Sequence, residues 1–340
     1  MSPLRTCSIE RHFIEQQQLH PEATGELTRL MHQLAFAAKQ ITKEVRSAGL
    51  SDILGVAGHT NVQGEVVQKL DEITNDVIYR AMDHAGVLCC MASEERADMI
   101  PIPAEFEYGK YTLAFDPLDG SSNIDANINV GTIFAIHRRS SPDGTPGTVE
   151  DLLQPGRELV VAGYIVYGSS TMMVYTTGHG VNGFTLEPSI GEFLLSHPDM
   201  RIPQHGKYFS INMGNYHYWS EGVRKYIDHI IAPNNQHGTP YSSRYIGSMI
   251  ADVHRTLLYG GLFMYPLDYK DPQKPKSKLR LLYEASPMSM VIEQAGGASS
   301  DGSQSILDVI PRGLHDRVQL FVGSRDNLAE LLSFLEKYDG

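Results

Sequence analysis

The sequence predicts a layered α/β protein with two domains. Helical and strand-like patterns alternate along most of the 340 residues, and 41% of the residues are hydrophobic, as in globular proteins. A stretch punctuated by Gly and Pro at residues 191–207 separates two such runs. Each sheet face and each apolar helix stripe must be buried against another element, which favours layers. We expect one domain over residues 1–200 and a second over residues 201–340.

The first long element is an amphipathic helix that begins near Thr24. Its apolar residues recur at helical spacing. They are Leu27, Leu30, Met31, Leu34, Ala38, Ile41 and Val45. Thr24 is available as the N-cap, and Glu26 lies near the positive end of the helix dipole. The segment 51–68 is rich in Gly and polar residues, which predicts a long mobile loop.

A second helix is predicted over residues 71–84. Strand patterns follow at residues 87–92, 111–115, 132–137, 159–167 and 171–177. After the division near residue 200, helical and strand patterns alternate again. Ser286-Pro287 opens a further helix and Gly296-Gly297 closes it, because Pro suits the first helical position and Gly the position past the last.

Charge and hydropathy narrow the class of protein. The net charge of −12 argues against general nucleic-acid binding, which needs a broad basic surface. The longest apolar runs are far shorter than the roughly 20 residues of a membrane-spanning helix. The N-terminal segment lacks the apolar core of a secretory signal, and three cysteines without zinc-like spacing predict buried thiols. We expect a cytoplasmic protein that binds neither nucleic acid nor membranes.

The most informative segment, residues 116–123, reads Asp-Pro-Leu-Asp-Gly-Ser-Ser-Asn and follows an apolar strand directly. Pro117 has no N–H for the sheet, so we expect the strand to end there and to deliver both aspartates, Asp116 and Asp119, to the sheet edge. The next three residues can expose successive backbone N–H groups, an arrangement that holds phosphate. They are Gly120, Ser121 and Ser122.

Two further acidic signals accompany this segment. Glu94-Glu95 follows a strand, and Glu284 ends the apolar run LRLLYE, which we interpret as another strand. Alone, an acidic pair is usually a solvated turn, and Asp-Pro-x-Asp-Gly is a common turn sequence. Together, five carboxylates at strand ends provide the oxygen ligands that Mg²⁺ prefers, enough for two or more ions. One ion would acidify a water molecule while another stabilises a leaving oxygen.

These motifs resemble those of the fructose-1,6-bisphosphatases of the animal and plant type, within the inositol-monophosphatase superfamily. The likeness includes GSMxADVHRTLxYGGxFMYP at residues 247–266 and KLRLLYE at residues 278–284, and it extends from Thr24 to Gly297. It implies a five-layer αβαβα fold with two mixed sheets. It also implies an allosteric domain over residues 1–200, which carries the metal-site motifs, and a substrate domain over residues 201–340.

The implied activity is Mg²⁺-dependent hydrolysis of fructose 1,6-bisphosphate to fructose 6-phosphate and phosphate, a step of gluconeogenesis. Water would attack directly, without a phosphoenzyme. The resemblance implies two or more Mg²⁺ ions per subunit, with Mn²⁺ or Zn²⁺ as alternatives. The implied metal ligands are Glu94, Glu95, Asp116, Asp119, Glu284 and the carbonyl of Leu118. Asp71 and Glu95 would polarise the water, and Glu65 would reach the metals from a loop that closes over them.

The resemblance divides substrate binding between two phosphate sites. Gly120, Ser121 and Ser122 would bind the 1-phosphate. The implied residues for the 6-phosphate are Asn212, Tyr245, Tyr265 and Lys278, with Arg244 contributed by a neighbouring subunit of a homotetramer. Tyr216 ranks below these residues, because an apparent extra residue precedes it. Arg280 is a candidate partner of Lys278.

An inhibitory AMP site is implied at the start of the first long helix. Its residues are Thr24, Gly25, Glu26, Leu27, Thr28, Lys110, Tyr111 and Arg138. A helix N-terminus offers N–H groups and a positive dipole end to a phosphate, although an ordinary capped helix explains the same residues. Three other functions remain open. They are a phosphatase acting on sedoheptulose 1,7-bisphosphate or an inositol phosphate, an inactive regulatory relative, and a nucleic-acid-binding module.

Overall fold

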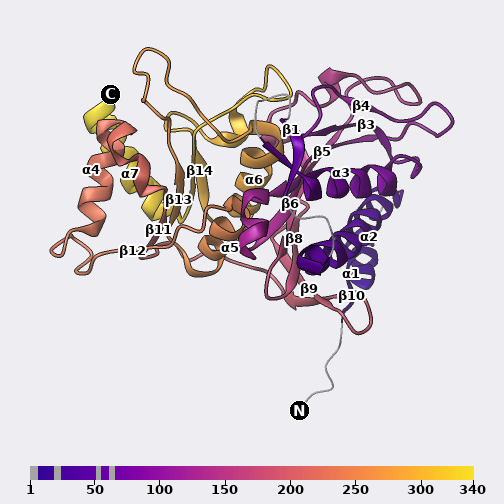
Figure 1. Ribbon diagram of the computed structural model, residues 1–340, viewed down its shortest axis with the longest axis horizontal. Helices are drawn as coiled ribbons and strands as arrows, with labels where there is room; N and C mark the ends of the chain where they lie inside the picture. Colours follow the sequence, from indigo (N-terminus) through magenta and orange to yellow (C-terminus); the bar gives the residue numbers. More distant parts are fainter. Residues whose placement is uncertain (1–6, 19–23, 51–54, 61–65) are drawn as a thin grey trace.

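The computed structural model describes residues 7–18, 24–50, 55–60 and 66–340, which form five layers (Figure 1). Helices α1 (Ile9–Gln17), α2 (Glu26–Ser47) and α3 (Lys69–Met82) cover the outer face of an eight-stranded sheet. Helices α5 (Met249–Tyr259) and α6 (Ser286–Gln294) lie between this sheet and a five-stranded sheet. Helices α4 (Glu221–Ile231) and α7 (Arg325–Asp339) form the last layer. The predicted αβαβα fold with two mixed sheets is confirmed.

The eight-stranded sheet has the strand order β10-β9-β8-β7-β6-β5-β3-β4. Its strands are β3 (Leu88–Ser93), β4 (Ile100–Pro101), β5 (Tyr111–Asp119), β6 (Val130–Arg138), β7 (Leu159–Tyr167), β8 (Thr171–Thr176), β9 (Asn182–Glu187) and β10 (Glu192–His197). Only β3 and β5 run parallel, with Ser93 opposite Phe115, whereas the other neighbours are antiparallel. The carboxyl ends of β3 and β5 therefore lie at one edge, where Glu94-Glu95 follows β3 and where Asp116 and Asp119 belong to the last residues of β5.

The five-stranded sheet has the order β12-β11-β13-β15-β14. Its strands are β11 (Tyr208–Ser210), β12 (Ser242–Ser243), β13 (Leu262–Tyr265), β14 (Ala298–Ser300) and β15 (Leu320–Gly323). β11 runs parallel to β12 and β13, and the remaining pairs are antiparallel. This second mixed sheet carries Tyr265 at the end of β13.

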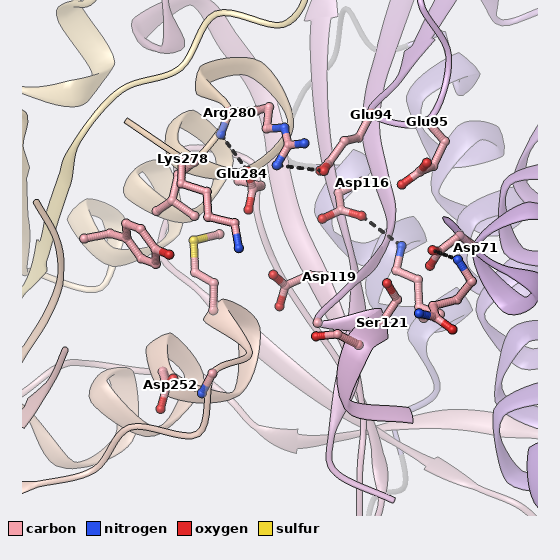
Figure 2. Close-up of a pocket in the computed structure, with 18 of the residues that line it drawn as sticks. Asp71, Glu94, Glu95, Asp116, Asp119, Ser121, Asp252, Lys278, Arg280 and Glu284 are labelled. Carbon is pink, nitrogen blue, oxygen red and sulfur yellow. Dashed lines mark hydrogen bonds and ion pairs between the residues drawn. The ribbon is translucent and has the colours of Figure 1, made fainter. Parts of the chain in front are cut away.

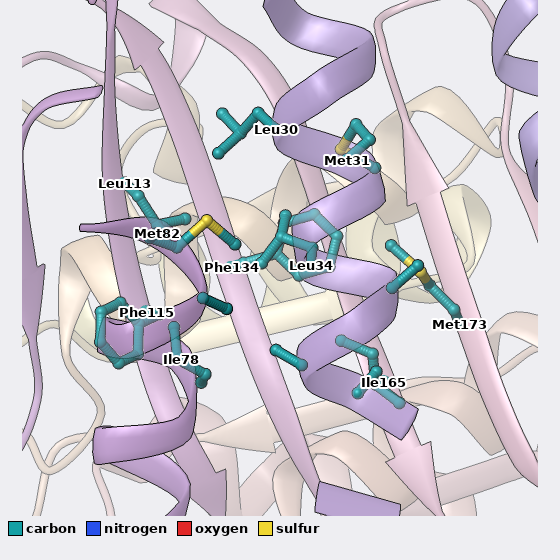
Figure 3. Packing of buried hydrophobic residues seen from close by; sticks show 14 of the residues in the cluster. Leu30, Met31, Leu34, Ile78, Met82, Leu113, Phe115, Phe134, Ile165 and Met173 are labelled. Atoms are coloured by element: carbon teal, nitrogen blue, oxygen red, sulfur yellow. The ribbon is translucent and has the colours of Figure 1, made fainter. Parts of the chain in front are cut away.

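Three apolar clusters hold the layers together. The first joins α1–α3 to the eight-stranded sheet, where Leu34 of α2 and Met82 of α3 pack beside Phe115 and Phe134 (Figure 3). The second lies between the two sheets around α5 and α6, and the third lies under α4 and α7. Burial of apolar surface between layers contributes most of the folding free energy. None of the helices described is both long enough and apolar enough to cross a lipid bilayer.

Four local predictions differ from the structure. Strand β5 does not end at Pro117 but continues to Asp119, with a shift in its register against β6 between Asp116 and Asp119. An irregular register accommodates a proline, which has no N–H to donate. The run 281–284 is not a strand: residues Leu281–Ala285 form a π-helical turn that continues into α6. Short apolar runs do not distinguish a buried helix from a strand.

The segment predicted as a long loop contains β1 (Val56–Thr60) and β2 (Val66–Gln68), which pair antiparallel. Glu65 lies outside the described residues. The predicted N-cap of the first long helix is also wrong, because Gly25, with a left-handed backbone at φ 83°, occupies that position of α2. Thr24 instead donates its hydroxyl hydrogen to Glu26 Oε2 at 2.8 Å.

Candidate active site

A cavity of about 420 Å³ lies where the ends of β3 and β5 face α5 and the turn before α6 (Figure 2). Its lining includes most of the residues proposed for the metal ions and the substrate. Those residues are Asp71, Glu94, Glu95, Asp116, Leu118, Asp119, Gly120, Ser121, Ser122, Tyr245, Tyr265, Lys278 and Glu284. Segments that are distant in the sequence therefore meet in one cavity.

Three buried carboxylates form the acidic centre of the cavity. Oxygens of Glu94, Asp116 and Glu284 lie within 4.8 Å of one another, and these side chains point toward a common space in Figure 2. The backbone N–H of Arg280 donates to Glu284 Oε2 at 2.6 Å, and the Arg280 guanidinium lies 3.1 Å from Glu94 Oε1. The backbone N–H of Leu118 donates to Asp116 Oδ1 at 2.9 Å.

The electrostatics of this centre favour a bound cation. Burial raises the pKa of Asp116 and of Glu284 well above the ordinary values, and the charge of Glu94 raises both further. Carboxylates this close cannot all be ionised in a low-dielectric site unless positive charge compensates them. The oxygen-only donors and the excess of negative charge fit hard divalent ions such as Mg²⁺.

Asp119 is held by the N-terminus of α5. Its Oδ2 accepts hydrogen bonds from the Ser248 hydroxyl at 3.0 Å and from the Ile250 backbone N–H at 2.8 Å. Burial raises its pKa, and these hydrogen bonds oppose the rise. The next residue, Gly120, has φ 77°, and a Cβ there would lie 2.8 Å from the Ser248 side chain. Only glycine fits this approach between the two segments.

Asp71 faces the same cavity from the first turn of α3. Its Oδ2 accepts the backbone N–H of Gln68 at 2.9 Å, as part of a capping box that fixes the start of the helix. Burial raises the pKa of Asp71 to about 7; the hydrogen bond from Gln68 opposes the rise, and the charge of Glu95 adds to it. A carboxylate with such a pKa can accept a proton near neutral pH.

The other end of the cavity is formed by Tyr245, Tyr265 and Lys278. Burial raises the pKa of Tyr245 to about 12, and its side chain is hydrogen-bonded to Asn212. Asn212 lines an adjoining cavity of about 210 Å³ that shares Tyr265 and Lys278 with the first. Hydroxyl and ammonium donors at this end suit a second anionic group.

Two of the residues considered for the 6-phosphate lie elsewhere. Arg244 is exposed, stacks 5.4 Å from the centre of the Tyr208 ring, and is not among the described residues that line either cavity. Tyr216 donates its hydroxyl hydrogen to Asp228 of α4 at 2.8 Å.

Two residues of the cavity were not assigned correctly from the sequence. Arg280, expected beside Lys278 at the 6-phosphate, lies instead against Glu94 at the acidic end. Asp252 was missed. Its carboxylate accepts the backbone N–H groups of Ile246 at 3.0 Å and of Gly247 at 3.2 Å, which fixes the segment after Tyr245. Burial raises the pKa of Asp252 to about 6, against the effect of these bonds. An acid in the first turn of a helix was the available signal.

A second cavity, of about 610 Å³, lies at the start of α2. Its lining includes every residue expected for AMP: Thr24, Gly25, Glu26, Leu27, Thr28, Lys110, Tyr111 and Arg138. Lys110 Nζ lies 3.0 Å from Glu26 Oε2, and the Arg138 guanidinium lies 5.7 Å from the centre of the Tyr111 ring. Cationic groups and a helix N-terminus thus share one cavity.

Comparison with known proteins identifies the family. The family model of the fructose-1,6-bisphosphatase N-terminal domain matches residues 7–198. The family model of the C-terminal domain matches residues 202–336. The chain belongs to the fructose-1,6-bisphosphatase family. The resemblance inferred from the motifs, and with it the expectation of a phosphatase, is confirmed.

Relatives of the same family match over nearly their full length. The chain is 55% identical to the fructose-1,6-bisphosphatase class 1 of Maridesulfovibrio salexigens, over 98% of each chain. It is also 55% identical to the class 1 enzyme of Chloroherpeton thalassium, over 94% of this chain and 91% of that one. The crystal structure of Leishmania major fructose-1,6-bisphosphatase in holo form is 40% identical, with a TM-score of 0.89, and the match covers 97% and 99% of the two chains.

Proposed function

We propose that this member of the fructose-1,6-bisphosphatase family hydrolyses the 1-phosphate of fructose 1,6-bisphosphate in a Mg²⁺-dependent reaction. The products are fructose 6-phosphate and phosphate, and the reaction serves gluconeogenesis in the cytoplasm. One observation carries the proposal: the cavity joins a buried carboxylate cluster at one end to Lys278 and two tyrosines at the other. These two groups of residues match a sugar with two phosphates: one phosphate reacts at the metal-binding carboxylates, and the other is held by Lys278 and the tyrosines.

The acidic end supplies the ligands for two or more Mg²⁺ ions. The ligand set is Glu94, Glu95, Asp116, Asp119, Glu284 and the carbonyl of Leu118. Bound divalent ions supply positive charge to the phosphoryl oxygens and lower the pKa of a bound water. Mn²⁺ or Zn²⁺ can take the same oxygen ligands.

The residues of the chain orient the reacting groups. Gly120 and the following serines offer backbone N–H and hydroxyl donors to the 1-phosphate. Asp71, assisted by Glu95, accepts a proton from the attacking water, because its pKa of about 7 suits a general base. Attack is direct, so no covalent phosphoenzyme forms.

Lys278, Tyr245, Tyr265 and Asn212 bind the 6-phosphate in this proposal. Arg244, exposed on the surface of the subunit, completes that site in a neighbouring subunit of a homotetramer. The preference for a bisphosphorylated sugar over an inositol phosphate follows from the two ends of the cavity. Comparing kcat/KM for fructose 1,6-bisphosphate, sedoheptulose 1,7-bisphosphate and an inositol monophosphate tests this preference.

We also propose that AMP inhibits the enzyme from the cavity at the start of α2. This cavity belongs to the proposed allosteric domain, residues 1–200. The AMP phosphate binds there to the backbone N–H groups that follow Gly25, and it displaces the Glu26 carboxylate from Lys110. Titrating AMP against the initial rate tests the proposal. Inhibition in the wild type and at least tenfold weaker inhibition in Lys110→Met are expected, and an unchanged rate at millimolar AMP contradicts it.

Phosphate release from fructose 1,6-bisphosphate, with Mg²⁺ and after chelation, tests the main proposal. We expect Mg²⁺-dependent release by the wild type and a loss of at least 100-fold in kcat for Asp119→Asn, because a charged ligand is removed. Glu105→Gln, an exposed acid outside the cavity, is the matched control and keeps full activity. Release that survives chelation, or full activity of Asp119→Asn, contradicts the proposal.

A further inference from the structure

Three metal-binding side chains meet in the outer helical layer, at the end of the molecule opposite α1–α3 (Figure 1). His229 comes from the last turn of α4, His237 from the loop between α4 and β12, and Glu330 from α7. Glu330 Oε1 lies 3.1 Å from Nε2 of His237 and 3.3 Å from Nε2 of His229. One ligand atom from each of the three lies within 4.8 Å of the other two.

Hydrogen bonding among the described residues accounts for only part of this cluster, because Nε2 of His237 is hydrogen-bonded to Glu330 Oε1 at 3.1 Å. Nε2 of His229 is buried and forms no hydrogen bond, although it lies 3.3 Å from Glu330 Oε1. Oε2 of Glu330 is buried and has no hydrogen-bond partner either, whereas Oε1 accepts from Gln236 and is hydrogen-bonded to His237. A buried polar atom without a partner costs free energy, so two of them in one cluster call for a missing ligand.

From this arrangement we infer a transition-metal site, with Zn²⁺ as its best occupant, formed by His229, His237 and Glu330. Two imidazoles and one carboxylate are the donor set of zinc sites that keep one coordination position open. With metal–ligand bonds of about 2.0–2.2 Å, tetrahedral ligand atoms lie roughly 3.3 Å apart. The two separations from Glu330 already match this spacing.

The surrounding residues position the ligands. Asn235 Nδ2 donates to the carbonyls of Ile230 and Thr239, both at 2.9 Å, which shapes the loop that carries His237. The His237 ring stacks on His205 with 4.7 Å between centroids, and His205 is in turn hydrogen-bonded to Tyr241. Such neighbours orient metal-binding imidazoles and limit the cost of ordering them.

This site differs in chemistry from the carboxylate cavity. Oxygen-only ligands suit Mg²⁺, whereas imidazoles favour Zn²⁺ and other late transition metals. The side chains of His229, His237 and Glu330 are 28%, 22% and 12% exposed, so the cluster lies close to the surface of the outer layer. Because its ligands come from α4, α7 and the loop between α4 and β12, the ion would tie together parts of the outer layer and stabilise it.

Zinc titration of the full-length protein in the presence of excess Mg²⁺ tests the inference. Excess Mg²⁺ competes for the oxygen ligands of the proposed active site, and a chromophoric chelator reports how much Zn²⁺ the protein still binds. We expect the wild type to bind one Zn²⁺ ion per chain that excess Mg²⁺ does not displace, the Mg²⁺-resistant equivalent. Binding of this ion should raise the Tm of the protein. His229→Ala, His237→Ala and Glu330→Gln should each bind this equivalent at least tenfold more weakly.

A matched control and a spectroscopic measurement complete the test. His84→Ala removes another histidine that pairs with a carboxylate, since Nδ1 lies 2.8 Å from Asp83 Oδ1, and it should keep the Zn²⁺ equivalent. Co²⁺ in the wild-type site should show the strong visible bands of a four-coordinate ion, and the His237→Ala variant should lose them. A wild type without Mg²⁺-resistant Zn²⁺, or equal binding in wild type and all three ligand variants, overturns the inference.

Discussion

At the level of single residues, the buried carboxylates of the cavity suit a bound cation but destabilise the fold without one. Asp116 and Glu284 are 5% and 4% exposed, and burial raises the pKa of each. Ionisation of these two side chains therefore destabilises the metal-free fold at neutral pH. The effect is absent below the pKa that the same carboxyl groups have in the unfolded chain, because they are then protonated in both states. Such a cost is usual where binding requires charge to be concentrated.

Asp116→Asn relieves part of this repulsion. We expect its metal-free form to unfold with a free energy about 1 kcal/mol higher than the wild type, because one of three crowded charges is gone. The stabilisation by added Mg²⁺ should fall sharply. Urea unfolding at pH 7, with a chelator and then with Mg²⁺, measures both changes. A metal-free Asp116→Asn protein that is less stable than the wild type would speak against crowded charge at this position.

Gly120 tests the close approach between the segment proposed to bind the 1-phosphate and the start of α5. Gly120→Ala adds a Cβ 2.8 Å from the Ser248 side chain at φ 77°. Gly144→Ala is the matched control, because Gly144 has φ 72° and no atom within 4 Å of the added Cβ. Both variants lose about 1 kcal/mol through the left-handed backbone. Only Gly120→Ala should lose more than this, together with most of the activity, and equal losses in both variants would rule out the crowding.

Between elements, the segment after Tyr245 is held by α5 through Asp252. Asp252→Asn keeps the size of the side chain but removes the charge that attracts the N–H groups of Ile246 and Gly247. We expect KM for fructose 1,6-bisphosphate to rise about tenfold with a smaller change in kcat, because the segment positions substrate and does not react. Steady-state kinetics measures this division, and a loss confined to kcat contradicts the positioning role.

Several elements could be predicted from the sequence because their signals are local. Strand β7 has the predicted bounds, and α6 begins at Ser286-Pro287 as its proline indicates. The π-helical turn at Leu281–Ala285 could not be predicted, since its apolar run fits a strand equally well until the neighbouring layers are known. The path of β5 through Pro117 also depends on its partner strand, where a register shift accommodates the proline.

Across the layers, the sequence indicated which acids line the cavity, although not how they meet. Glu94 could be placed after one strand and Asp116 near the end of another, and the parallel pairing of β3 and β5 brings the two acids together. Asp252 and Arg280 reach the cavity through packing between the two sheets. The position of Asp252 in the first turn of α5 was a local signal, whereas no local pattern placed Arg280 beside Glu94. The His229, His237 and Glu330 cluster is likewise a product of tertiary packing.

The stability of the fold should also depend on pH through His137, which is 2% exposed on β6. Burial lowers the pKa of His137 from 6.5 to about 4, so the unfolded chain takes up a proton first as the pH falls below 6.5. Neutral His137 therefore contributes to the free energy of unfolding above pH 6.5, and this contribution is lost as the pH falls toward 4. Between pH 7 and 5 the wild type should lose about 2 kcal/mol more than His137→Gln. Parallel losses measured by urea unfolding would contradict the assignment.

The carboxylate cluster of the candidate active site can be tested directly by anomalous X-ray diffraction from crystals that contain Mn²⁺ in place of Mg²⁺. We expect anomalous peaks between the carboxylates of Glu94, Asp116 and Glu284, at roughly 2.0–2.3 Å from their oxygens. The same peaks should be missing in crystals of Asp116→Asn. Strong manganese peaks elsewhere on the protein, with none among these three carboxylates, would contradict this expectation.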